Sequence, residues 1–152
     1  MEKELTRFFD TSLNNALRNL KEDSKAKWGT MTAKQMLIHL IQSSKMMHFG
    51  NNTLLIKEEY VEKAIAFLYT DKAIKKGLVV PNDIGFNFTN NNEDIEELKA
   101  ELINSSNNML VFLIENTEFK AIHPFFGELT AAQWSIFQRK HYIHHLSQFG
   151  LL

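Results

Sequence analysis

Histidines concentrate near the C-terminus, where His141, His144 and His145 account for half of the six in the chain. The pattern of apolar residues around them predicts a helix. His141 and His145 are four residues apart, and four residues advance a helix by about 400° and about 6 Å. Their rings therefore project from nearly the same face. Two imidazoles placed in this way can bind one divalent metal ion, as the paired histidines of zinc peptidases do.

A third metal ligand has to come from another part of the chain, and His39 is the natural candidate. It falls in a predicted second helix, beside Met36, Leu40 and Ser43. A buried neutral imidazole needs a partner for each ring nitrogen, which a metal and a surrounding shell of hydrogen-bond acceptors supply. The alternative is a set of core histidines that hydrogen-bond to neighbouring polar groups. The residues alone leave both interpretations open.

Four further residues have weaker claims to a role in such a site. His144 lies about 60° from His141 on the helical wheel, so spacing does not exclude it as the ligand. His48 falls at the end of the second helix and is predicted to lie at the surface or in a hinge. His123 precedes a proline, which favours a rigid turn over a pocket mouth. Glu128 precedes the last helix, where a carboxylate can cap the helix or support a metal site.

The elements that must position these residues follow from the helical spacing of apolar side chains. Thr32 and Thr130 are each followed three residues later by a glutamine, the spacing of a capping box, so each is predicted to begin a helix. The predicted helices cover roughly residues 2–22, 33–47, 57–76, 93–116 and 131–149. The least helical stretch is 78–92, and a loop is predicted at 123–127.

In the last helix, one face carries residues at a 4-3-4-3 spacing that is typical of a helix turned toward other helices. This face consists of Trp134, Gln138, His141, His145 and Gln148. The two histidines are therefore predicted to point inward, toward the second helix and His39. The fold class predicted is all-α, with a single domain over residues 1–152. The predicted architecture is an antiparallel four-helix bundle, to which an extra short helix can be added.

Composition excludes several classes of function. A formal net charge of −1 creates no field that would recruit nucleic acid or an anionic membrane, and the lysines at 72, 75 and 76 are too few to change this. The absence of cysteine excludes disulfides, thiolate metal sites and a cysteine nucleophile. No signal-peptide pattern and no run of about 18 apolar residues is present. We expect a cytoplasmic protein without a membrane partner.

Three strings carry a resemblance to a known family. They are Trp28-Gly29-x-Met31-x-x-x-Gln35-Met36-x-x-His39-Leu40, His123-Pro124-Phe125-Phe126-Gly127-x-Leu129-Thr130 and Lys140-His141-x-x-His144-His145-x-x-Gln148-Phe149-Gly150. The chain resembles the DinB-like superfamily, the damage-inducible four-helix proteins, and within it a branch known as a domain of unknown function. The resemblance runs through the whole chain in order, although residues 50–115 carry no distinguishing motif.

The resemblance implies a metal site and an enzyme class. In the superfamily, one histidine of the second helix and two in the last helix bind a divalent metal, usually nickel or zinc. By matching position, these would be His39, His141 and His145. Some members are S-transferases that conjugate bacillithiol, mycothiol or glutathione to an electrophile, and many have no assigned activity.

Three hypotheses for function follow. The first is a metal-dependent transferase that joins a small thiol to an electrophile, with the electrophile at the open end of the bundle near His123 and Phe126. The second is a metal-dependent hydrolase, which needs an acid–base residue, and Glu128 is the candidate. The third is a bundle that binds a ligand or a partner without catalysis, with hydrogen-bonded histidines and no metal.

Overall fold

A computed structural model describes residues 2–48, 53–78 and 92–152 of the protein, which are mostly helical. Its helices are α1 (Glu2–Arg7), α2 (Leu13–Leu17), α3 (Ala33–Lys45), α4 (Val61–Leu68), α5 (Ile95–Glu115) and α6 (Ala131–Gln148). Short helical turns occupy Phe8–Ser12, Met46–His48 and Glu58–Tyr60, and the strands are β1 (Lys120–His123) and β2 (Gly127–Thr130). The all-α prediction is therefore right for most of the chain and misses one small sheet.

The N-terminal helix is continuous from α1 to α2 through a single turn of π-helix, in which the Leu13 N–H bonds to the Phe8 carbonyl. It ends at Leu17, five residues before the predicted end. Leu20 is nevertheless 1% exposed, because two tight turns bring it back onto the core. The pattern of buried apolar residues therefore continues past the end of the helix to Leu20. For this reason the sequence predicts a helix that is too long.

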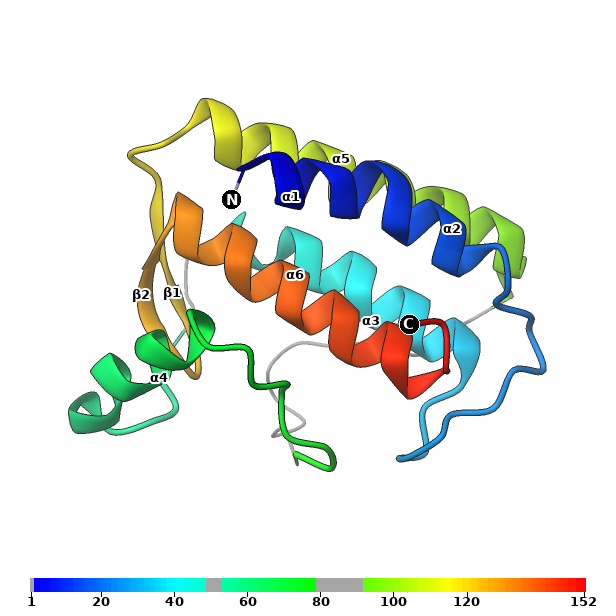
Figure 1. Ribbon diagram of the computed structural model, residues 1–152, viewed down its shortest axis with the longest axis horizontal. Coiled ribbons are helices and arrows are strands. Elements are labelled where there is room, and N and C mark those ends of the chain that lie inside the picture. Colours follow the sequence, from blue (N-terminus) through cyan, green and yellow to red (C-terminus); the bar gives the residue numbers. More distant parts are fainter. Residues whose placement is uncertain (1, 49–52, 79–91) are drawn as a thin grey trace.

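The long helices lie side by side around one core (Figure 1). α3 packs against α5 and α6, and the N-terminal helix packs against both α5 and α6. The centre of the core holds Phe9, Trp134 and Tyr142, which are fully buried, and the rings of Phe9 and Tyr142 meet edge to face at 5.3 Å. Large aromatic side chains of this kind contribute much of the burial that holds helices together.

The directions of the helices differ in part from the prediction. Figure 1 shows α6 running opposite to both α3 and α5, as predicted for neighbours. However, α3 and α5 run in the same direction, so this pair is not antiparallel. The long connection between them contains α4 and residues 69–78, which lets the chain return to the end where α3 began. α3 and α6, the helices predicted to carry the metal ligands, do face each other.

The predicted third helix, 57–76, is much shorter than expected, because α4 ends at Leu68. From residue 69 the backbone crosses α6, and Lys140 Nζ donates to the carbonyls of Thr70 (2.6 Å) and Lys72 (2.7 Å). These carbonyls would otherwise accept intrahelical bonds. Lys140 therefore takes the place of the backbone N–H donors that a longer helix would supply to these carbonyls. Nothing in the local sequence predicts this contact.

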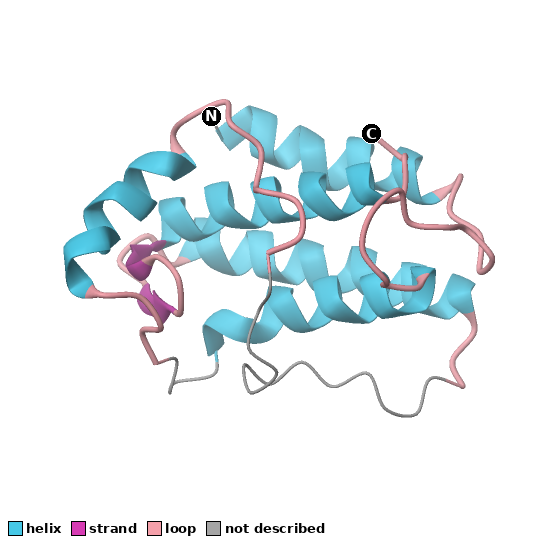
Figure 2. Ribbon diagram, turned by 90° about the horizontal axis from the view of Figure 1, so that it is seen from below, coloured by secondary structure: helices cyan, strands magenta, loops and turns pink. Residues whose placement is uncertain are grey.

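The predicted loop at 123–127 is the turn of a hairpin. β1 and β2 pair antiparallel from Lys120 opposite Thr130 to His123 opposite Gly127. Gly127 has a φ of 74°, and a Cβ at this position would lie 2.7 Å from Val61 Cγ1 of α4. Glycine therefore allows the hairpin and α4 to pack together at one end of the helices, where both views place them (Figure 2).

Two features remain from the sequence prediction. Most of the stretch predicted to be least helical, 78–92, lies outside the described residues, which include only its two ends. In the described part of the chain, no helix is both long enough and apolar enough to cross a membrane.

Candidate metal centre

Two capping boxes fix where the helices of the site begin. Thr32 Oγ1 accepts a hydrogen bond from the Gln35 N–H (3.1 Å), and Gln35 Oε1 accepts one from the Thr32 N–H (2.9 Å). Thr130 and Gln133 make the same pair of bonds at the start of α6, at 3.3 and 3.0 Å. Both predicted helix starts are confirmed. The boxes satisfy N–H groups that a first turn leaves unpaired, so α3 and α6 begin at defined residues.

Three histidines converge between α3 and α6. The Nε2 atoms of His39 and His141 are 2.9 Å apart, and those of His141 and His145 are 3.1 Å apart. Tetrahedral ligands about 2.0–2.1 Å from a zinc ion are about 3.3 Å from one another, so this spacing suits one shared ion. The three residues form the only such group of His, Asp or Glu in the described part of the chain. The predicted trio is therefore close enough to bind a metal ion.

A chain of hydrogen bonds fixes the tautomer of His141. Gln138 Nε2 donates to the Ser43 carbonyl (2.8 Å), which turns Gln138 Oε1 toward the Ser43 hydroxyl (3.2 Å). Because an amide oxygen can only accept, the hydroxyl donates to it. Ser43 Oγ must then accept from His141 Nδ1, which lies 3.0 Å away. With its proton on Nδ1, neutral His141 presents a lone pair on Nε2.

His145 is fixed in the same way from the other side. Gln148 Nε2 donates to the carbonyl of Trp28 (3.0 Å), so Gln148 Oε1 faces His145 Nδ1 at 2.9 Å. The oxygen accepts the Nδ1 proton, and Nε2 again carries a lone pair. Gly29 permits this contact, because a Cβ at its position would lie 3.0 Å from Gln148 Nε2. A loop near residue 28 therefore orients the ring of His145.

The lone pairs of His141 and His145 thus face each other at 3.1 Å. Such a pair repels unless a positive charge or a shared proton lies between the nitrogens. An extra proton is disfavoured, because burial lowers the pKa of His145 to about 4 and that of His141 well below its ordinary value. His39 can donate to only one of the two nitrogens. A divalent cation fits this set of donors, and outer hydrogen bonds of this kind are typical of metal-binding histidines.

A metal ion held by the three histidines would be partly accessible and would keep an open coordination position. His145 is buried, whereas His39 and His141 are half-buried, so part of the cluster faces solvent. Burial, together with the neighbouring His145 and His144, lowers the pKa of His39 to about 3, so this ring is also neutral near pH 7. Three neutral protein ligands leave at least one coordination position for a small molecule.

His144 lies outside the trio, which answers the question that its spacing leaves open. Its ring packs against Trp28 and His145, with ring centroids 5.7 and 5.0 Å apart, and hydrogen-bonds to the backbone of Ile74. Burial lowers its pKa. His144 therefore holds the crossing segment 69–78 against α6 instead of joining the cluster of nitrogens.

The remaining candidates also lie outside the cluster. His123 is 3% exposed and its Nδ1 accepts the Phe125 N–H (3.1 Å), which agrees with the predicted rigid turn. It packs against Phe126, the other residue expected to lie near the electrophile, with ring centroids 4.9 Å apart. His48 is exposed, as predicted. Glu128 is exposed on β2 and pairs with Lys120 (3.9 Å), so it neither caps α6 nor supports the trio.

Sequence reasoning predicts the three converging histidines but not the residues that orient their rings. Gln138 and Gln148 share the inward face of α6 with the histidines, so their spacing is a usable signal. Ser43 follows His39 by four residues, which places both on one face of α3. The carbonyl of Trp28 carries no such signal, because any residue type supplies one. A comparison of the chain with known protein families, curated proteins and solved structures finds no match.

Proposed function

We propose that this protein is a divalent-metal-dependent enzyme, and that it transfers a low-molecular-weight thiol to an electrophile. One observation carries the proposal: the Nε2 lone pairs of His141 and His145 face each other, each held there by a glutamine-based hydrogen-bond chain. We assign His39, His141 and His145 as the ligands, and zinc or nickel as the metal, since imidazole nitrogen suits both.

Each residue of the site then has a role. The three histidines hold the ion, and Ser43 and Gln148 keep the two rings of α6 turned toward it. A bound divalent ion supplies Lewis acidity that favours the thiolate form of a thiol. The thiol would lose its proton to solvent, and its sulfur would form a C–S bond as a halide ion leaves, or as an epoxide C–O bond breaks and the freed oxygen takes a proton from solvent. A cysteine-free chain takes this thiol from solution.

The transferase is favoured over the hydrolase by what surrounds the trio. A hydrolase needs a base that removes a proton from water. Glu128, the one candidate predicted, is exposed and ion-paired with Lys120. No carboxylate joins the histidine cluster in the described part of the chain. A thiol gives up its proton far more readily than water, so a site of histidines alone suits thiol chemistry better.

Membership of the DinB-like superfamily is part of the same proposal. The N-terminal helix, α3, α5 and α6 would be the four helices of its bundle, and α4 the extra short helix. The packing of these helices on one another and the position of the trio between α3 and α6 support it. We also propose a cytoplasmic setting, since small thiols are kept reduced there.

The test measures metal content first and catalysis second. Protein purified without a nickel column or chelator is analysed for metals, and roughly one divalent ion per chain is expected. Apo, zinc and nickel forms are then given several small thiols and either an epoxide or an activated halide. The loaded forms should accelerate product formation, most strongly below the free-thiol pKa of about 8.5.

A His48→Ala variant is the matched control, because His48 is exposed and lies outside the trio. It should behave like wild type, whereas His141→Ala should lose both metal and activity. Equal rates for apo and loaded protein across all thiols would refute the transferase. Hydrolysis of a reporter ester by the loaded form alone would favour the hydrolase. Absence of metal and of both activities would leave a non-catalytic binding bundle.

A further inference from the structure

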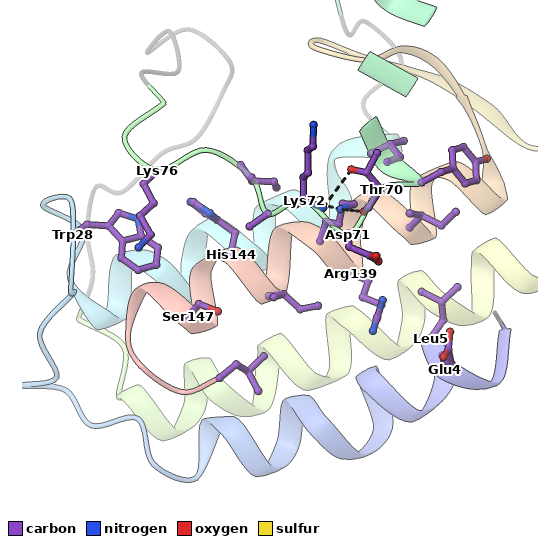
Figure 3. A pocket seen from close by; sticks show the side chains of 18 of the residues that line it. Glu4, Leu5, Trp28, Thr70, Asp71, Lys72, Lys76, Arg139, His144 and Ser147 are labelled. Atoms are coloured by element: carbon purple, nitrogen blue, oxygen red, sulfur yellow. Dashed lines mark hydrogen bonds between the residues drawn. The ribbon is translucent and has the colours of Figure 1, made fainter. Parts of the chain in front are cut away.

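A groove of about 630 Å³ lies on a face of α6 away from the metal centre (Figure 3). Its walls come from α6, the start of α1, the loop at Trp28 and the crossing segment 69–78. None of the three metal-site histidines lines it. The volume is within the range of small-molecule sites, which is about 300–1,000 Å³. The groove is therefore large enough for a ligand of its own.

Arg139 lies in this groove with an unsatisfied donor. Its Nε is buried and has no hydrogen-bond partner among the described residues. No described carboxylate forms an ion pair with it, although Glu4 and Asp71 also line the groove. Its guanidinium carbon is 5.8 Å from the ring centroid of Phe8. A buried donor without an acceptor is costly. Arg139 also lines the groove, and a guanidinium pairs with a carboxylate through two parallel hydrogen bonds.

The charge of the groove favours an anion. Its lining residues include five lysines and arginines but only two acidic side chains, although the chain as a whole has a net charge of −1. Lys140 already donates two hydrogen bonds, to the carbonyls of Thr70 and Lys72, but its positive charge remains close to Arg139. A positive site with apolar walls attracts an anion more strongly than an exposed cluster of lysines does.

The floor of the groove favours an organic ligand over an inorganic ion. Leu5, Leu68, Ile136 and Ile143 contribute apolar surface. At one end the ring of Trp28 lies beneath Lys76, whose Nζ is 4.2 Å from the ring centroid, and Figure 3 shows Arg139 toward the other end. An inorganic anion would leave most of this apolar surface uncovered.

We propose that this groove binds a small organic carboxylate, with its carboxylate group on Arg139 and its apolar body along the floor toward Trp28. The site is separate from the metal centre, so the proposal goes beyond the transferase and does not depend on it. The ligand class follows from three features together: a buried arginine donor without a partner, a local excess of positive charge, and an apolar floor.

The test uses 4-phenylbutyrate as the probe. The comparison compounds are 4-phenylbutanol, which is neutral, and 4-phenylbutylamine, which is positively charged; both have a similar shape. Binding is followed through the indole N–H signals of the two tryptophans in ¹H–¹⁵N spectra. Trp28 lines the groove and should shift saturably. Trp134 is fully buried, bonds to the Ala121 carbonyl and should not shift. The carboxylate should bind at least about tenfold more tightly than the alcohol or the amine, since a charge-assisted pair is worth about that much.

Variants assign the effect to Arg139. Arg139→Gln should weaken binding about tenfold, and Arg139→Lys should give an intermediate loss because it keeps the charge but not the fork. Lys63→Gln makes the same change of charge at an exposed position of α4 outside the groove and should bind as wild type. Arg139→Lys also decides the question if Arg139→Gln fails to fold.

Affinity should be the same in zinc-loaded and metal-free protein, so failure of the metal proposal would leave this one standing. Equal binding of carboxylate and alcohol, or unchanged binding by both Arg139 variants, would overturn the carboxylate site. Inorganic phosphate binding as tightly as 4-phenylbutyrate would show a site for simple anions instead.

Discussion

Two parts of the molecule bury histidines, and they use the ring nitrogens in opposite ways. Between α3 and α6, the Nδ1 atoms of His141 and His145 donate to side-chain oxygens, which leaves lone pairs on Nε2. In the hairpin, His123 Nδ1 accepts the Phe125 N–H, so the proton of the neutral ring is on Nε2. Phe137 lies between the two regions, 4.3 Å from His123 and 5.3 Å from His141 between ring centroids.

A lowered pKa does not distinguish the two groups of histidine. Desolvation lowers the pKa of His123 to about 3, as it does for His39. Aromatic rings surround His123, whereas nitrogen atoms face His141. The hydrogen bond at Nδ1 is therefore the informative feature, because it decides whether Nε2 is a donor or a metal ligand.

The largest expected effect is loss of metal on removing a nitrogen of the trio. His141→Ala should reduce metal uptake from about one ion per chain to none, because the Nε2 of His141 lies within 3.1 Å of the Nε2 atoms of both His39 and His145. His123→Phe should retain the ion, since its surroundings are aromatic. Elemental analysis of dialysed protein measures both. Equal uptake by wild type and His141→Ala would remove the distinction between the two regions.

A smaller effect should follow from releasing one Nδ1 proton. Gln148→Leu removes the acceptor of His145 Nδ1 and should weaken metal affinity about ten- to hundredfold, the usual effect of losing such a partner. Gln133→Leu on the same helix disturbs only the capping box and should leave metal affinity near wild type. Competition with a chelator of known affinity measures the change. Equal effects of the two substitutions would mean that the hydrogen bond does not orient the ligand.

The two regions should also respond together to acid. The pKa of His123 is lowered to about 3 and that of His145 to about 4, whereas unfolded histidines titrate near 6.5. Between these values the unfolded chain binds more protons, so stability falls as pH falls, by up to about 1.4 kcal/mol per pH unit and histidine. Urea unfolding of metal-free protein from about pH 7 to about pH 5 measures this. His123→Phe should flatten the slope by one proton, and a pH-independent stability would contradict the assignment.

The smallest effect is expected at His144, which borders the metal centre without joining it. His144→Ala should leave metal affinity within about threefold of wild type, because its ring bonds to the Ile74 backbone and not to the cluster. It should instead loosen segment 69–78, which amide hydrogen exchange measures. A loss of metal as large as that of His141→Ala would place His144 among the ligands.

Local patterns predict much of this structure. The capping boxes at Thr32 and Thr130 are read directly from the sequence, and so is the shared face of His141 and His145. The match between His39 and the last helix depends on a resemblance as well as on spacing. Local sequence does not reveal the contacts that Lys140 makes to the carbonyls of Thr70 and Lys72, just beyond the end of α4, because Lys140 is about 70 residues away. The hairpin is missed because its strands are only four residues long.

The link between Trp28 and Gln148 joins segments 120 residues apart, and His39 and His141 are separated by 102 residues. If the proposed ion binds, it ties the second helix to the last as a covalent cross-link would, in a chain that has no cysteine to form one. Closing so long a loop reduces the conformational entropy of the unfolded chain more than closing a short one. The same ion would then serve both as the reactive centre and as a reversible cross-link. The free energy of unfolding would therefore depend on the concentration of available metal.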